Sequence, residues 1–115
     1  MIIVDTSIWI DHLRGIDSPL DDVLGSGLEL LHPFVYGELL LNGLPQRGAF
    51  AERLHGLKPA PLASPADVAA FIVWAKLAGT GVGYVDTNLI SGGCILSLDR
   101  NLQAQAQRLG LAYRP

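Results

Sequence analysis

The stretch Met1-Ile2-Ile3-Val4-Asp5-Thr6-Ser7 guides the interpretation of the rest of the sequence. Its short apolar run has no alternating polar positions, which is typical of a central strand in a parallel sheet. An acid and two hydroxyl residues follow at once, and Thr6 or Ser7 is expected to cap a helix over 8–14. Ligands of open α/β sheets bind at the carboxyl ends of the strands, so Asp5 lies where a site is expected.

Short apolar segments alternate with helical patterns along the chain. Further strands are expected at 28–31 and 94–98, with a last strand at 111–113 and a Pro-rich segment at 59–63 that is at most a poor edge strand. Helices are expected at 18–25, 33–42, 45–55, 64–78 and 101–109, with a short helix or turn at 84–90. This alternation predicts an α/β fold, a three-layer α/β/α sandwich with a central parallel sheet, as a single domain over 1–115.

The composition narrows the class of protein. Half of the 115 residues are hydrophobic and 17% are charged, which excludes disorder and leaves enough apolar surface to suggest a second copy as partner. The net charge of −3 means that any nucleic acid must be met through local basic residues and a metal. A single cysteine, Cys94, and no stretch approaching a membrane span favour a soluble protein of the cytoplasm.

Four acids stand out from the others. Asp5 and Asp99 each follow a predicted strand directly, so both are expected at one edge of the parallel sheet. Glu38 and Asp86 lie in otherwise apolar segments, where a carboxylate is costly to bury unless it meets a cation. The sequence therefore predicts a divalent ion, and oxygen ligands suit Mg²⁺ or Mn²⁺. A plainer alternative is that Asp5 and Asp99 only cap the helices that follow them.

Other side chains are expected to assist this set. The hydroxyl groups of Thr6, Ser7 and Ser97 are expected to hold the carboxylates in place from behind. Arg14 and Arg100 each lie near an acid and are weak candidates for phosphate contacts.

Four segments carry a resemblance to a known family. Residues 4–14, with Val4-Asp5-Thr6-Ser7, resemble the opening of PIN-domain ribonucleases of the VapC toxin type. The segments 32–39, 81–90 and 96–102 resemble that family's motifs for the second, third and fourth acid, with Ser97 in place of a more usual Thr. The motifs occur in order over nearly the whole chain, and together they are highly specific.

The resemblance implies an activity and partners. It implies a Mg²⁺- or Mn²⁺-dependent endoribonuclease in which a metal-activated water cleaves RNA phosphodiesters. It further implies the toxin of a toxin–antitoxin pair, a homodimer inhibited by a cognate antitoxin. By matching position, Asp5, Glu38, Asp86 and Asp99 carry over as the catalytic acids, with Asp5, Asp86 and Asp99 as metal ligands.

One departure from the family keeps a second interpretation open. The segment from Asp86 to Asp99 is about five residues shorter than the family's usual segment, which is more than one turn of helix. The alternative function is therefore a catalytically weakened PIN-like module that binds a partner protein. A phosphoacceptor signalling domain is disfavoured, because neither Lys58 nor Lys76 follows a late strand. A phosphatase with a nucleophilic Asp is also disfavoured, because no second acid stands two residues after Asp5.

Overall fold

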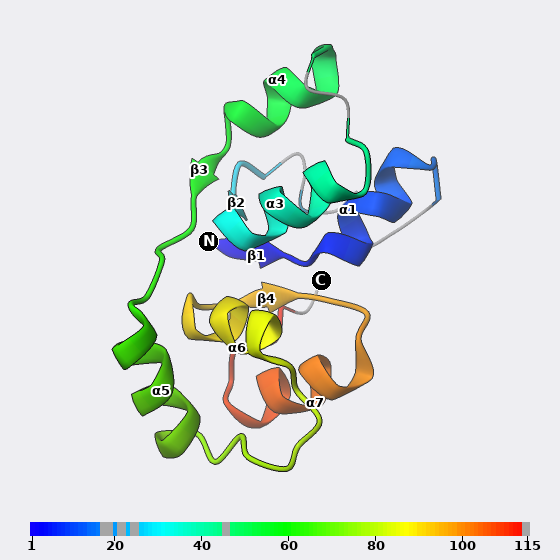
Figure 1. Ribbon diagram of the computed structural model, residues 1–115. Coiled ribbons are helices and arrows are strands. Elements are labelled where there is room, and N and C mark those ends of the chain that lie inside the picture. The colour runs from blue at the N-terminus through cyan, green and yellow to red at the C-terminus, as the bar shows by residue number, and fades with distance from the viewer. Residues whose placement is uncertain (17–19, 21–22, 24–25, 45–46, 114–115) are drawn as a thin grey trace.

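The computed structural model describes residues 1–16, 20, 23, 26–44 and 47–113 (Figure 1). Its central sheet has four short strands in the order β3-β2-β1-β4, and every neighbouring pair is parallel. The strands are Ile2–Val4 (β1), Glu29–Leu31 (β2), Lys58–Pro59 (β3) and Ile95–Leu96 (β4). The predicted α/β fold with a central parallel sheet is confirmed.

Six helices in the described residues flank this sheet. They are Thr6–Leu13 (α1), Pro33–Leu41 (α3), Ala49–His55 (α4), Pro65–Trp74 (α5), Tyr84–Ser91 (α6) and Arg100–Arg108 (α7). Figure 1 shows α1, α3 and α4 on the side of β1 and β2, and α5, α6 and α7 on the side of β4. The pairing of β1 with β4 therefore joins an N-terminal half of the fold to a C-terminal half. In the described residues no helix is both long enough and apolar enough to cross a membrane.

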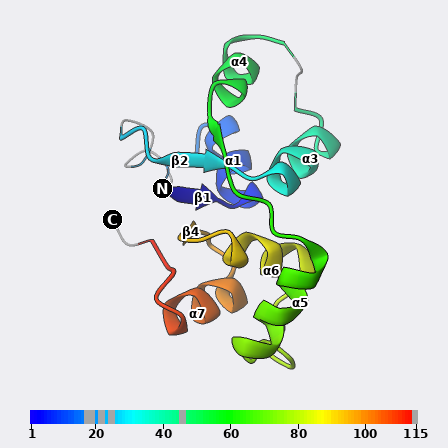
Figure 2. The same cartoon turned by 90° about the vertical axis from the view of Figure 1, so that its left-hand side faces the viewer.

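The first strand forms the centre of the core. Ile2, Ile3 and Val4 are at most 4% exposed, and Ile3 pairs with Leu30 on one side and Ile95 on the other. The backbone N–H of Asp5 then donates to the carbonyl of Leu96, 2.9 Å away. Asp5 is thereby fixed where β1 and β4 both end. Figure 2 shows that β1 and β2 point toward the end of the sheet where α3 and α6 lie.

Side chains at the strand ends begin the helices. Asp5, and not Thr6 or Ser7 as expected, caps α1, because its carboxylate accepts from the backbone N–H of Thr6. The helix consequently begins two residues before the predicted start. Asp99 caps α7 in the same way, through the N–H of Leu102. Ser64 caps α5 as the sequence predicts.

Several boundaries differ from the sequence predictions. The expected strand at 94–98 is paired only at Ile95–Leu96, and the expected last strand at 111–113 is reduced to a single bridge between Ala112 and Ile95. The edge strand is Lys58–Pro59 and not 59–63, because the chain leaves the edge of the sheet after Pro59 to reach α5. The predicted helix at 18–25 lies largely outside the described residues, as does the expected helix start at 45.

Candidate active site

The four predicted acids line one pocket of about 520 Å³ at the carboxyl end of the sheet. Asp5 directly follows β1 and Asp99 lies at the N-cap of α7, three residues after the last residue of β4, while Glu38 comes from α3 and Asp86 from α6. Two halves of the fold thus contribute two carboxylates each. Thr6 and Ser7 also line the pocket, together with Ile10, Asn42 and Leu98. Among the described residues that line it there is no Lys, Arg or His.

The carboxylate of Asp5 is held by hydrogen bonds on both oxygens. Oδ1 accepts from the backbone N–H of Thr6 at 2.8 Å. Oδ2 accepts from the hydroxyl of Ser97 at 2.8 Å and from the more distant hydroxyl of Ser7 at 3.5 Å. Asp5 is only 8% exposed, so these bonds replace much of its hydration. Its side chain therefore has a fixed orientation in the pocket.

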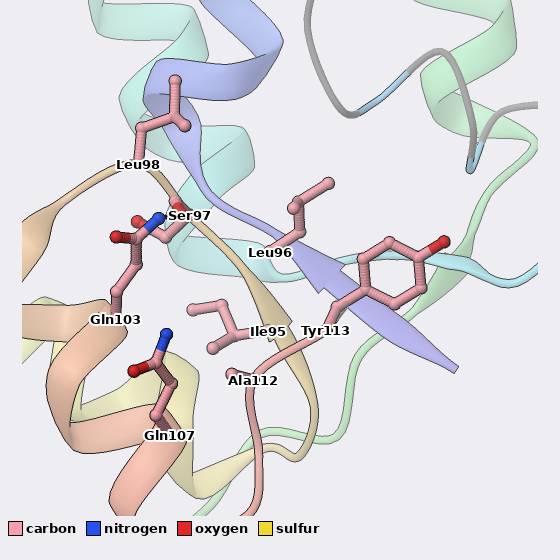
Figure 3. A pocket seen from close by; sticks show the side chains of 8 residues that line it. All are labelled: Ile95, Leu96, Ser97, Leu98, Gln103, Gln107, Ala112 and Tyr113. Carbon is pink, nitrogen blue, oxygen red and sulfur yellow. Dashed lines mark hydrogen bonds between the residues drawn. The ribbon is translucent and has the colours of Figure 1, made fainter. Parts of the chain in front are cut away.

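Ser97 links the two acids at the strand ends. Its buried hydroxyl donates to Asp5 and accepts the backbone N–H of Asp99 at 3.0 Å. The amide of Gln103 on α7 donates to the Ser97 carbonyl. Figure 3 shows Gln103 and Gln107 of α7 facing this end of β4, around a second small pocket that also contains Tyr113. Hydrogen bonds to the hydroxyl and to the carbonyl of Ser97 therefore hold the turn between β4 and α7.

Glu38 and Asp99 are held less completely. The Glu38 Oε1 atom accepts from the hydroxyl of Thr6 at 3.2 Å. One oxygen of the exposed Asp99 carboxylate accepts the N–H of Leu102 at 2.9 Å. Each of the three hydroxyl residues expected to support the acids thus donates to one of them, although Thr6 contacts Glu38 and not Asp5. Asp5 and Asp99 are helix caps, as the plainer alternative proposed, and they also face the shared pocket.

Asp86 differs from the other three acids. No hydrogen bond reaches its carboxylate from the part of the chain that the structure describes, and its pKa is raised from 3.8 to about 6. The first cause is burial, and repulsion from Asp5, Asp99 and Glu38 adds to it. A carboxylate in this setting is stabilised by any cation that enters the pocket. Strongly raised pKa values of this kind are common at functional sites.

The short segment after Asp86 is accommodated by close packing. Only Gly92, Gly93 and Cys94 separate α6 from β4. A Cβ atom at Gly92 would lie 2.7 Å from the Cδ1 atom of Ile3, so α6 ends directly against the central strand. A glycine at position 92 thus allows this close approach. Asp86 still lines the pocket with the other three acids.

The oxygen donors of the pocket suit a hard divalent cation, but their side chains are not arranged as metal ligands. Every acidic donor is a carboxylate oxygen, which is what Mg²⁺ and Mn²⁺ prefer. Within the described residues, however, no group of three or more His, Cys, Asp or Glu is arranged so that it could hold a metal ion. Binding would therefore require side-chain rotation, most easily at Asp86, whose carboxylate accepts no hydrogen bond from the described residues, and least easily at Asp5, which accepts three.

The two arginines predicted as phosphate contacts, Arg14 and Arg100, occupy different positions. Arg14, at the end of α1, lines a separate pocket next to the acidic one, whereas Arg100 is exposed and does not line the acidic pocket. Three pocket residues escaped the sequence analysis: Ile10, Asn42 and Leu98. The position of Asn42 could have been predicted from the sequence. It follows Glu38 by four residues, so the two side chains lie on the same face of a helix.

Comparison with known proteins gives close relatives of nearly the same length. Two curated relatives, from the CDC 1551 and H37Rv strains of Mycobacterium tuberculosis, are each named Ribonuclease VapC32. Each is 35% identical over 118 aligned positions, which cover 97% of this chain and 95% of the relative. The aligned length exceeds the 115 residues of this chain, so the relatives carry residues with no counterpart in it. No protein-family model matches the chain, and no solved structure does.

Proposed function

This chain belongs to the VapC ribonuclease family, and on that premise we propose that it is a divalent-metal-dependent endoribonuclease, the toxin of a toxin–antitoxin pair. We further propose that residues 1–115 form a single PIN-like domain acting on RNA in the cytoplasm. The observation that carries the proposal is the pocket that Asp5, Glu38, Asp86 and Asp99 line together, where burial, and then repulsion from the other three acids, raises the pKa of Asp86 to about 6. Such an excess of negative charge favours a bound Mg²⁺ or Mn²⁺ ion.

The proposed reaction is hydrolysis of a phosphodiester. The oxygen of water bonds to phosphorus while the bond from phosphorus to one ribose oxygen breaks. A divalent ion would activate that water and offset the charge on the phosphate. Asp5, Asp86 and Asp99 would hold the ion, and Glu38 would complete the acidic set.

Other residues of the chain would orient the acidic side chains. Ser97 and the N–H of Thr6 keep the Asp5 carboxylate in one orientation, so no reorganisation of this group is needed during the reaction. The Thr6 hydroxyl orients Glu38. Asp86 has no such bond among the described residues, and its pKa of about 6 means that a cation in the pocket would stabilise its charged form.

The proposal is tested by metal dependence and by titration of Asp86. We expect purified protein to cleave labelled single-stranded RNA with Mg²⁺ or Mn²⁺ and to stop when a chelator removes the ion. Carboxyl NMR should show the pKa of Asp86 falling below about 6 when Mg²⁺ is added, because a cation favours the charged form. Absence of cleavage with either ion would reject the ribonuclease. Cleavage that continues after chelation, with the pKa of Asp86 unchanged by Mg²⁺, would reject the proposed metal dependence.

Two protein partners belong to the proposal. A cognate antitoxin would inhibit the enzyme by covering the acidic pocket. A homodimer is supported by the exposed face of α5, where Val73 is 78% exposed and Trp74 is 74% exposed beside Ala69 and Ala70. Sedimentation of the wild type and of Trp74→Glu would test the dimer, which the added charge should weaken.

A second candidate function is a PIN-like module that binds a partner without cleaving RNA. Two observations favour it: the described residues contain no ready-made metal-ligand group, and only three residues join α6 to β4. Calorimetry with Mn²⁺ separates the two functions, because this module would bind its protein partner tightly and the ion not at all.

A further inference from the structure

Another pocket, distinct from the one around Gln103 and Tyr113, lies directly beside the acidic pocket. It has a volume of about 330 Å³ and lies between α1 and α3, and we refer to it as the α1–α3 pocket. Ile10 and Asn42 line both pockets, so the two cavities are adjacent. Its volume falls in the range of pockets that hold small ligands or parts of larger ones.

The lining of the α1–α3 pocket is apolar with two polar groups at hand. Leu13, Leu39 and Leu44 supply the apolar part, together with the shared Ile10. The polar groups are the Arg14 guanidinium and the Asn42 amide. Mostly apolar walls with a few convergent polar groups are the usual composition of a specific ligand site.

Arg14 is available for an anionic ligand. Its side chain is exposed, and in the described residues it makes no ion pair or hydrogen bond. It stands at the C-cap of α1, where a cation is favoured by the helix dipole. Because the net charge of the protein is −3, local cations such as Arg14 are needed to attract a nucleic-acid phosphate.

Asn42 keeps hydrogen-bonding groups for a ligand. Its amide nitrogen donates one N–H to the Glu38 carbonyl at 2.8 Å, which fixes the side chain and leaves the amide oxygen as an acceptor and the second N–H as a donor. Amino groups on the edges of adenine, cytosine and guanine are donors that such an oxygen can accept.

We infer that the α1–α3 pocket binds the nucleotide next to the cleaved phosphodiester, with its base against the leucines and its phosphate on Arg14. This inference rests on the proposed ribonuclease, because it takes the acidic pocket as the place of cleavage. RNA fits this pocket better than a wholly apolar peptide segment, because its phosphate supplies an anion for the exposed Arg14.

The first experiment measures RNA binding separately from cleavage. Anisotropy of a labelled single-stranded RNA is recorded with Asp5→Asn protein, with and without Arg14→Ala. We expect Arg14→Ala to weaken binding about tenfold, as expected when one hydrogen bond to a charged group is lost. The slope of log affinity against log salt should shrink by about 0.7, which corresponds to one phosphate contact on a single strand. Arg53→Ala, which removes an exposed arginine near the end of α4, is the matched control and should change neither quantity.

The second experiment measures specificity. A pool of RNA with randomised positions is cleaved by wild type, Asn42→Ala and Leu13→Ser, and the products are sequenced. We expect both variants to flatten the nucleotide preference at one position beside the cut. In the Arg14→Ala variant KM should rise while kcat stays unchanged, as it does when binding is lost equally in the ground and transition states.

The outcomes separate this inference from the proposed function. If wild type cleaves RNA while Arg14→Ala, Asn42→Ala and Leu13→Ser behave like Arg53→Ala, the inference is overturned and the ribonuclease stands. If wild type cleaves nothing, yet Arg14→Ala weakens RNA binding and Arg53→Ala does not, the pocket binds RNA and the ribonuclease fails. Unchanged RNA binding in every pocket variant also overturns the inference, and loss of a protein partner in those variants would assign the pocket to that partner.

Discussion

The end of β1 and the first turn of α6 hold their acids in opposite ways. Asp5 accepts hydrogen bonds on both carboxylate oxygens and is 8% exposed, whereas no hydrogen bond from the described residues reaches the Asp86 carboxylate. Repulsion from the other acids adds to the effect of burial on Asp86 and raises its pKa to about 6. The difference indicates a fixed side and an adjustable side of one pocket. A metal ion or a proton is expected to change the adjustable side first.

Removing the charge of the fixed side should have the largest effect. Asp5→Asn keeps an oxygen that can cap α1, so the fold should persist. We expect kcat/KM for RNA cleavage to fall about 10²–10³-fold, which is typical when one preorganised electrostatic contact is lost. The pKa of Asp86 should fall as well, because one repelling charge is gone. Asp67→Asn, an exposed acid on α5, serves as control. Equal activity of the two variants would show that Asp5 is only a helix cap.

Loosening the fixed side should have the next largest effect. Ser97→Ala removes the hydrogen bond to Asp5 Oδ2 and the acceptor of the Asp99 N–H. We expect activity or metal affinity to fall about 10–100-fold, as is usual for groups that orient metal ligands. Ser97→Thr keeps the hydroxyl and should retain most of the activity. If the Thr variant is as impaired as the Ala variant, packing and not the hydrogen bond is the cause.

The fixed side is also the part of the site that the sequence predicted best. A short β-branched run followed by Asp5 constrains both the strand and the position of the acid, because a buried parallel strand has few alternatives. The same reasoning placed Asp99 directly after a strand, but β4 ends at Leu96 and Asp99 lies at the N-cap of α7. The sequence did not decide which residue caps α1, because Asp5, Thr6 and Ser7 are all good capping residues. Only the backbone geometry decides among them, and the cap is Asp5.

The remaining features depend on tertiary packing. The sequence could place Glu38 and Asp86 on apolar segments, but not their distances from Asp5. Ile10 and Leu98 give no chemical signal, so their place in the pocket follows only from the folded chain. The limits of β4 and of the last strand also depend on pairing, since a single bridge at Ala112 arises from contact with Ile95 and not from local preference.

The adjustable side should reveal itself in the pH dependence of stability. The pKa of Asp86 is about 6 in the folded protein against 3.8 for an unperturbed aspartate, so the folded state binds more protons between these limits. Its contribution to stability is therefore present below pH 3.8 and is lost as the pH rises through about 6. Asp86→Asn should stabilise the metal-free protein by about 1 kcal/mol at pH 7.5, a value reduced for solvent screening. Urea unfolding at several pH values measures this, and a variant less stable than wild type at pH 7.5 would contradict it.

The smallest effect is expected at Thr6, whose hydroxyl donates to Glu38. Thr6→Val has nearly the same shape and removes only the 3.2 Å hydrogen bond to Glu38 Oε1. Glu38 is partly exposed, so water can replace that bond, and we expect a loss of about 0.5–1 kcal/mol in stability with a change of only a few-fold in kcat/KM. The same unfolding and cleavage assays measure both quantities. An activity loss as large as that of Ser97→Ala would mean that Glu38 must be held as firmly as Asp5, and the division into a fixed and an adjustable side would then apply to Asp86 alone.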